Sequence, residues 1–444
     1  MKSALFFFLT CAWILGACSD RDPVSANQPT EPAAKRRTSG ITVTSIPVAG
    51  LAESRIPSLG AVEVRAGKPV KIRSLLAHTI APSLGISQRH GVELAVRDIG
   101  RIHGYAIDLG EPVDGTCGPD GGRAGAEQIS ADPQVIGVIG TSCSGAAVAA
   151  SPVFSEAGLV MISPSNTSPR LTSDLAGNPG PDYHPGYYRV DDNDLYQGQA
   201  VADFAYRELE LKRMATVDDG DPYTSALVSA FGDAFLSLGG EVTAVTQIQK
   251  GDTDMTEVLA AITATDPDGI FFPLFEVEGS PFTEQARGFD GLEDATLITG
   301  SALLISGFLG QPHSEGIYGA GPVADLGVNV NAFTGANAGE VLAAYKATYG
   351  ESPASAYWAH AYDATTLLLS AIESVAVVED EKLFVDRAAL REELSATADF
   401  QGLLGTLTCD GFGDCGTGRV NIYHHTDPSV TDPAQLPVVY QFAP

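Results

Sequence analysis

Strand-like and helix-like segments alternate along this chain, and polar turns follow the strands. Val135–Gly140 is an uninterrupted run of apolar residues and glycine, as found in buried strands. Residues 146–156 form a helix-like segment of small residues, and residues 159–162 form a second strand-like run. Polar turns follow both strands, at residues 141–145 and 163–167. A strand, a helix and a strand in this order indicate a βαβ unit, and therefore a parallel sheet.

The two polar turns are candidates for a ligand site. In open parallel sheets, ligands bind beyond the carboxyl ends of the strands, where both turns would lie. Ser144 is predicted to cap a helix whose free backbone N–H groups point outward and suit a carboxylate. Thr167 supplies a second hydroxyl. Helix capping alone is the alternative role of both side chains.

The same alternation extends over most of the chain. Further strands are predicted at Val70–Leu76, 105–109 and 187–190, with helices at 91–99 and 123–130. After a polar crossover at 191–194, a second series follows, with helices at 196–209, 223–238 and 255–265 and strands at 214–217, 242–248, 270–272, 295–299 and 316–320. Helices at 339–349 and 359–375 and strands at 402–408 and 420–423 complete the pattern. A chain of 444 residues with two such series is expected to form an α/β protein of two lobes.

Cys143-Ser144 and Ser163-Pro164-Ser165-Asn166-Thr167 carry a family resemblance. The chain from Val70 onward resembles the substrate-binding proteins of branched-chain amino-acid ABC transporters, the leucine/isoleucine/valine-binding family. The resemblance implies a type I periplasmic binding protein fold: two Rossmann-like βα lobes, joined by a three-strand hinge, that close on a small ligand. We expect lobe 1 to comprise residues 70–190 and 324–400, and lobe 2 residues 191–323 and 401–444.

The resemblance also implies a set of ligand contacts. The position of Tyr223 packs against the ligand from the second lobe, and the carbonyl of Ser165 matches a ligand position. The predicted ligand-binding residues are Ser144, Ser165, Asn166, Thr167, Tyr223, Phe275 and Glu276. The family usually presents an acid for the ligand's ammonium group after the strand at 295–299, where this chain has Gly300, and an aromatic position near the first strand is replaced within residues 82–85. Glu276 is the expected substitute for the missing acid, and the side-chain preference of the site stays open.

Four of the six cysteines form two candidate pairs. The pairing of Cys117 with Cys143 matches a bridge in the resembled family. Cys409 and Cys415 flank a turn-rich run suited to a short-loop bridge. In an oxidising compartment we expect two disulfides. A metal site is the weaker alternative, because neither pair has Cys-x-x-Cys spacing and His424 lies beyond a strand-like run.

The amino terminus predicts export and lipid anchoring. Lys2 precedes an apolar stretch at 4–13 that is too short to span a bilayer. Leu15-Gly16-Ala17-Cys18 then matches the bacterial lipobox, which predicts a signal peptide at 1–17 and a lipidated Cys18, while Cys11 leaves with the signal peptide. Residues 18–69 would form a flexible tether and an N-terminal extension. An ordinary signal peptide or an uncleaved anchor is the alternative.

Other classes of function fit the sequence less well. Acidic residues outnumber basic ones by 55 to 26 and are dispersed, which argues against binding nucleic acid. Residues 140–145 resemble a nucleophile elbow but lack the Gly-x-Ser-x-Gly pattern. Residues 411–416 spell Gly-x-Gly-x-x-Gly but lead into a strand, so we interpret them as a hairpin turn.

The sequence therefore predicts a lipid-tethered solute-binding protein rather than an enzyme. It would bind a small polar solute, an amino acid or a relative, and deliver it to the permease subunits of an ABC importer. No cofactor, metal or nucleic acid is expected, and the membrane would be contacted through the lipid only. The alternative is a ligand-sensing receptor domain that reports to a membrane partner.

Overall fold

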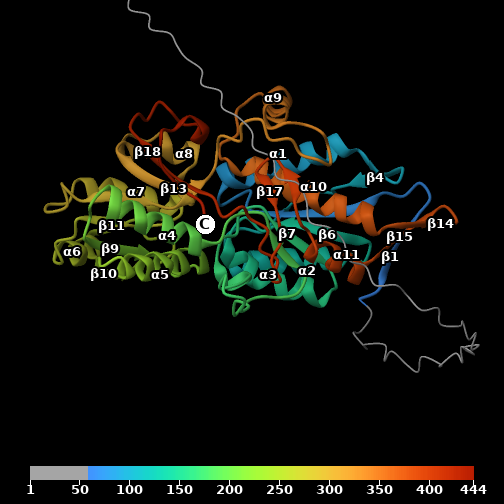
Figure 1. The fold of residues 1–444 in the computed structure, drawn as a ribbon, viewed down its shortest axis with the longest axis horizontal. Helices are drawn as coiled ribbons and strands as arrows, with labels where there is room; N and C mark the ends of the chain where they lie inside the picture. Colours follow the sequence, from blue (N-terminus) through green and yellow to red (C-terminus); the bar gives the residue numbers. More distant parts are fainter. Residues whose placement is uncertain (1–58) are drawn as a thin grey trace, which may run out of the picture. The chain divides into compact units, whose positions relative to one another are not determined.

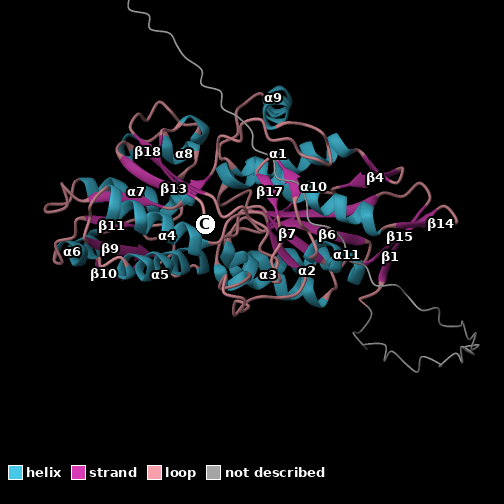
Figure 2. Ribbon diagram, in the orientation of Figure 1, coloured by secondary structure: helices cyan, strands magenta, loops and turns pink. Residues whose placement is uncertain are grey.

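Two large sheets organise the described part of the chain, residues 59–444 of the computed structural model (Figures 1 and 2). The predicted signal peptide, the predicted lipidation at Cys18 and Cys11 lie outside these residues. Within residues 59–444, no helix combines the length and the apolar character needed to cross a membrane.

The first sheet has the strand order β3-β4-β2-β6-β7-β8, with β5 paired to β2. The strands are β2 (Val70–Leu76), β3 (Arg101–Ile102), β4 (Tyr105–Asp108), β5 (Val113–Asp114), β6 (Val135–Gly140), β7 (Val160–Ser163) and β8 (Tyr187–Arg189). All pairings are parallel except that of β3 with β4. Every residue of β6 is buried, which is typical of a parallel strand covered on both faces. The βαβ interpretation of this region is confirmed.

Helices cover both faces of this sheet. On one face Ile136 and Ile139 pack with α1 (Pro82–Ile99), α9 (Ala338–Tyr349) and α10 (Tyr357–Val375). On the other, Val135 and Val138 pack with α2 (Pro119–Ser130) and α3 (Ser144–Glu156). Figure 1 shows α10, drawn in orange-red, beside α1, in blue, so segments far apart in sequence share one core.

The second sheet has the order β10-β9-β11-β12-β13-β18-β19. Its strands are β9 (Arg213–Asp218), β10 (Glu241–Gln247), β11 (Gly269–Phe271), β12 (Thr296–Thr299), β13 (Ile317–Pro322), β18 (Val420–His425) and β19 (Val438–Phe442). β18 pairs antiparallel with both β13 and β19, and the other pairings are parallel. Two hydrophobic cores lie against this sheet. One contains residues of α4 (Asp194–Asp203), the π-helical turn Phe204–Glu208 and α5 (Pro222–Ser237). The other contains residues of α6 (Thr256–Thr263), α7 (Glu276–Arg287) and α8 (Ser306–Leu309).

The chain passes between the two sheets three times, as the resemblance implies: from β8 to α4, from β13 to α9, and before β18. Leu403, Leu404 and Leu407 pack in the core of the first sheet, although the sequence predicts that lobe 2 resumes at residue 401. The exact division of the chain between the lobes stays a prediction.

Some elements differ from those predicted. The single strand expected at 402–408 is wrong: the segment is a hairpin of β16 (Phe400–Gly402) and β17 (Gly405–Leu407), because the chain reverses through Gly405 at a positive φ of 117°. A third sheet of β1 (Ala61–Arg65), β15 (Lys382–Asp386) and β14 (Val377–Glu379), followed by α11 (Arg387–Ser395), was not predicted. Short 3₁₀ turns occur at Pro169–Leu171, Ser301–Leu303, Pro312–Ser314 and Pro433–Gln435.

Candidate functional site

Two adjoining cavities lie between the lobes. The inner cavity has a volume of about 30 Å³ and the outer one about 320 Å³. The cavities share four lining residues, Leu84, Phe275, Ala302 and Ile305. Leu84 belongs to α1 of the first lobe and the other three to the second, so a solute bound here would touch both lobes.

The inner cavity is lined by hydroxyl groups from both lobes. Besides the four shared residues, its lining consists of Ser142, Cys143, Ser144, Ser165, Tyr223, Ser301 and Tyr357. The structure therefore brings together three predicted ligand-binding residues, Ser144, Ser165 and Tyr223, and places Phe275 on both cavities.

A buried glutamine orders the serines of the first lobe. Ser142 Oγ donates to Gln88 Oε1 at 2.5 Å, and Gln88 Nε2 donates to Ser165 Oγ at 2.5 Å. Ser165 Oγ in turn donates to the Ser142 carbonyl at 2.7 Å. The Ser165 proton is thus already used, which leaves its oxygen atoms as acceptors. Sequence reasoning missed Gln88, although a polar residue four positions from Leu84 and Val92 on a buried helical face is a detectable signal.

Ser144 starts α3 but does not cap it. The N-cap residue is Cys143, and no side chain caps the helix, so the expected capping by Ser144 is wrong. Ser144 Oγ accepts a long hydrogen bond of 3.4 Å from the Ser168 N–H, which leaves the hydroxyl proton free for a ligand oxygen. Uncapped N–H groups at a helix N-terminus favour an anion. A carboxylate at this position would be stabilised both by these N–H groups and by the Ser144 hydroxyl.

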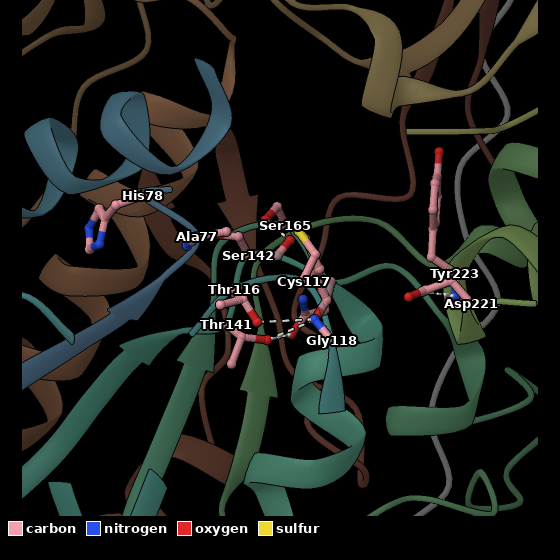
Figure 3. The surroundings of a disulfide bond; sticks show 12 residues. Ala77, His78, Thr116, Cys117, Gly118, Thr141, Ser142, Ser165, Asp221 and Tyr223 are labelled. Carbon is pink, nitrogen blue, oxygen red and sulfur yellow. Dashed lines mark hydrogen bonds between the residues drawn. A yellow bond between two sulfur atoms is a disulfide. The ribbon is translucent and has the colours of Figure 1, made fainter. Parts of the chain in front are cut away.

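The Cys117–Cys143 disulfide joins the loop before α2 to the start of α3. Figure 3 shows Ser142 and Ser165 beside this bridge, and Tyr223 and Asp221 across from it on the second lobe. The second predicted bridge, Cys409–Cys415, is also present. Both disulfide predictions are confirmed.

Asn166 and Thr167 lie behind the cavity wall. Asn166 Oδ1 accepts from Thr141 Oγ1 at 3.3 Å and from the Tyr187 hydroxyl at 3.2 Å, so this side chain braces the loop after β7. Thr167 is buried, and its side chain lies beside the Asp194 carboxylate. Neither residue belongs to the lining of the two cavities.

The outer cavity is mainly apolar and carries charged groups at its edge. Ile80, Ala81 and Val277 join the four shared residues, while Glu276, Glu278 and Lys250 add charge. Glu276 is the first residue of α7, and burial raises the pKa of its half-buried carboxyl group. Lys250 Nζ pairs with Asp221 Oδ2 at 2.6 Å and lies 5.1 Å from the centre of the Phe275 ring.

Gly300 replaces the acid of the resembled family, and the structure shows what fills its space. A Cβ on Gly300 would overlap the Tyr223 hydroxyl. Burial raises the Tyr223 pKa, so the phenol is neutral, and its hydroxyl lies beside Ser301 and the backbone of Ala302. Tyr357 and Ser301 beside it were not predicted as site residues. The helix containing Tyr357 was expected to begin at residue 359, so Tyr357 was not recognised as part of it.

Neither the cavities nor the rest of residues 59–444 contain a group of three or more His, Cys, Asp or Glu side chains that could hold a metal ion.

The fold and this cleft define a bilobal binding protein, and comparison with known proteins gives its family. Residues 79–418 match the family model described as periplasmic binding protein, and the chain belongs to that family. The family and the similar proteins are solute-binding proteins rather than enzymes.

The chain is similar to several amino-acid-binding proteins. It is 25% identical to Leu/Ile/Val-binding protein homolog 3 of Brucella melitensis over 78% of this chain and 89% of that protein. The leucine-binding protein LivK from Thermotoga maritima MSB8 is 25% identical with a TM-score of 0.71, over 84% of this chain and 99% of that chain. A solute-binding protein from R. palustris, solved with benzoate, shares the fold at 21% identity and a TM-score of 0.69, over 85% of this chain and 97% of that chain.

Proposed function

We propose that this protein binds a small zwitterionic solute, an amino acid or a close relative, between its lobes and presents it to the permease subunits of an ABC importer. One observation carries the proposal: Ser144, at the start of α3, and Tyr223, on the second lobe, line the same cavity. The amino-acid-binding names of the similar proteins support it.

The two cavities would bind different parts of the solute. The solute's carboxylate would lie in the inner cavity, where Ser144 and the first turn of α3 offer O–H and N–H donors. The inner cavity, at about 30 Å³, has room for one or two water molecules rather than a whole amino acid. The rest of the solute would therefore extend into the outer cavity, whose lining favours an apolar side chain.

Direct contacts between the lobes describe a closed arrangement. Ser168 Oγ, on the first lobe, donates to the Pro222 carbonyl at 2.9 Å. The Asp221 carboxylate approaches Gly145 so closely that a Cβ there would lie 2.5 Å from Asp221 Oδ2. These contacts would break on opening, and a bound solute that bridges the lobes would shift the equilibrium toward closure.

Export and anchoring complete the proposal. The lipobox at 15–18 supports lipidation of Cys18 and attachment to the membrane of the bacterial cell envelope through that lipid. Cys18→Ser should then release the protein from the membrane fraction while leaving its solute affinity unchanged. Wild-type protein without lipid would contradict the anchor and leave the binding function standing.

Isothermal titration calorimetry with a panel of L-amino acids tests the binding function. At least one amino acid should bind, and Ser144→Ala should weaken that binding by about 1–3 kcal/mol, the usual loss for a hydrogen bond to a charged group. Ser237→Ala, which alters an exposed serine in the last turn of α5, is the matched control and should bind as the wild type does. Failure of every amino acid to bind would contradict the proposal.

A further inference from the structure

The first turn of α7 brings two carboxyl groups to the outer cavity. Glu276 and Glu278, the first and third residues of the helix, both line this cavity. Glu278 is 4% exposed, and its Oε1 accepts from the Gly251 N–H at 2.7 Å. Glu276 is half-buried at the boundary of the same cavity. Two acidic groups therefore border a cavity whose lining is otherwise mostly apolar.

The Glu276 carboxylate has neither an ion-pair partner nor a hydrogen-bond partner among residues 59–444. Its Oε1 lies 2.5 Å from the point where a Cβ on Gly307 would stand, and Ser83 Oγ lies 3.4 Å from the same point. Ser83 belongs to α1 on the first lobe, whereas Glu276 and Gly307 belong to the second. The carboxylate therefore lies where the two lobes meet, within reach of a solute held between them.

Lys250, the cation among the residues that line the outer cavity, is engaged elsewhere. Its Nζ pairs with Asp221 Oδ2 at 2.6 Å, and the Asp221 side chain is 2% exposed. Lys250 and Asp219 have opposite effects on the pKa of Glu278, so the charge of Lys250 is shared among several carboxylates. Burial alone raises the pKa of Glu276, so Lys250 lies too far away to neutralise it. The start of α7 thus leaves negative charge at the cavity without a counter-ion.

A solute that fills the outer cavity would change the surroundings of this carboxylate. Water can solvate Glu276 in the open cleft, but an apolar group packed against it would displace that water. A carboxylate that loses its water without gaining a donor is costly. The site therefore disfavours a purely apolar side chain at Glu276 and favours one that brings a positive charge there.

An apolar section separates Glu276 from the inner cavity. The four residues that line both cavities, Leu84, Phe275, Ala302 and Ile305, are all apolar, whereas Glu276 lines only the outer cavity. The outer cavity, at about 320 Å³ against about 30 Å³ for the inner one, has room for a long side chain. Lysine and arginine side chains have the matching shape, because an apolar stem carries their charged end.

We propose that Glu276 binds a cationic group at the far end of the solute's side chain, so that the site selects a basic amino acid with a long apolar stem. This inference rests on the proposed function and specifies its substrate class. The solute's carboxylate lies in the inner cavity, its stem passes the apolar section, and its terminal ammonium or guanidinium group meets the start of α7. Glu276 then differs in role from the acid at the α-amine that it was expected to replace.

Isothermal titration calorimetry with pairs of similar shape tests the subsite. L-arginine is paired with L-citrulline, whose end group is neutral, and L-lysine with L-2-aminoheptanoate, which carries a methyl group in place of the ammonium group. Each probe is titrated into wild type, Glu276→Gln and Glu284→Gln. Glu284→Gln is the matched control, because it removes the same charge from an exposed position of the same helix. Thermal melts establish that each variant is folded.

Wild type should bind at least one cationic amino acid about 10-fold or more tightly than its neutral partner, as expected for a hydrogen bond to a charged group. Glu276→Gln should remove most of this preference, whereas Glu284→Gln should keep it. Added salt should narrow the preference in wild type, because it screens the attraction between the two charges.

Three outcomes would overturn the subsite. If wild type binds the neutral partners as tightly as the cationic amino acids, or binds L-leucine but none of the four probes, the subsite is wrong while the amino-acid function stands. If folded Glu276→Gln keeps the wild-type preference, the cationic group lies elsewhere and the role of Glu276 is wrong. If neither the probes nor any other L-amino acid binds, the subsite fails together with the proposed function.

Discussion

Replacing Asp414 should destabilise the protein through a buried arginine. Arg189, at the end of β8, is 0% exposed, and its Nη2 lies 2.7 Å from Asp414 Oδ2 and its Nε 3.2 Å from Oδ1. Asp414 also accepts from Asn193 Nδ2 at 2.9 Å and lies in the loop closed by Cys409–Cys415. Asp414→Ala leaves the guanidinium buried without its counter-ion.

The expected cost is about 3–5 kcal/mol, the usual penalty for breaking a buried ion pair from one side. With an unfolding entropy of about 2.1 cal/mol/K per residue over residues 59–444, this corresponds to a fall of about 4 to 6 °C in Tm, if they unfold as one unit. Differential scanning calorimetry near pH 7 measures the shift.

Asp182→Ala is the matched control for this experiment. Asp182 pairs with Arg170 at 2.6 Å, but the arginine side chain is 47% exposed, so the pair is worth at most about 1 kcal/mol. If Asp414→Ala melts within a degree of Asp182→Ala, the Arg189–Asp414 pair does not stabilise the crossover as we argue.

Three further predictions concern the cleft. The folded pKa of Asp194, about 7, lies above the ordinary value of 3.8, so this group makes the ligand-free protein less stable as the pH rises from about 4 through 7. Urea denaturation at pH 5 and pH 8 should show that the free energy of unfolding falls less between these pH values in Asp194→Asn than in wild type. Equal falls would contradict a raised pKa for Asp194. Replacing both Cys117 and Cys143 with serine opens a link across 26 residues and should cost about 3.5 kcal/mol on the loop-entropy model, whereas an unchanged Tm would contradict it. Gly300→Ala should cost about 1–3 kcal/mol in denaturation experiments, because the new methyl group overlaps the Tyr223 hydroxyl, and a neutral effect would mean that Tyr223 moves freely.

The parallel strands were predictable because the pattern of residues within each strand indicates its burial. Val70–Leu76 and Val135–Gly140 are predicted with the bounds that the structure shows. Val135–Gly140 is the continuous run that a strand covered on both faces requires, whereas Val70–Leu76 alternates buried and half-buried residues before it ends in a fully buried stretch. The position of Ser144 at a strand's carboxyl end followed from the same logic, because parallel strands end at one edge.

The sheet of β1, β14 and β15 depends on contacts that no local pattern contains. Val62 pairs with Val385 more than three hundred residues away, and the alternation within β1 extends over only five residues. The acidic crossover illustrates the same limit in the cleft. In sequence, Asp191 and Asp194 look like a solvated turn, and only the packing of both lobes around them removes these carboxylates from water.

The central claim is that a solute binds between Ser144 and Tyr223, and a crystal structure of the protein with the tightest-binding amino acid tests it most directly. Our account predicts density for the solute in the inner and outer cavities, with its carboxylate at the start of α3. Density at the surface cavity lined by Leu367, Glu393 and Phe400, with the cleft unchanged, would contradict the account.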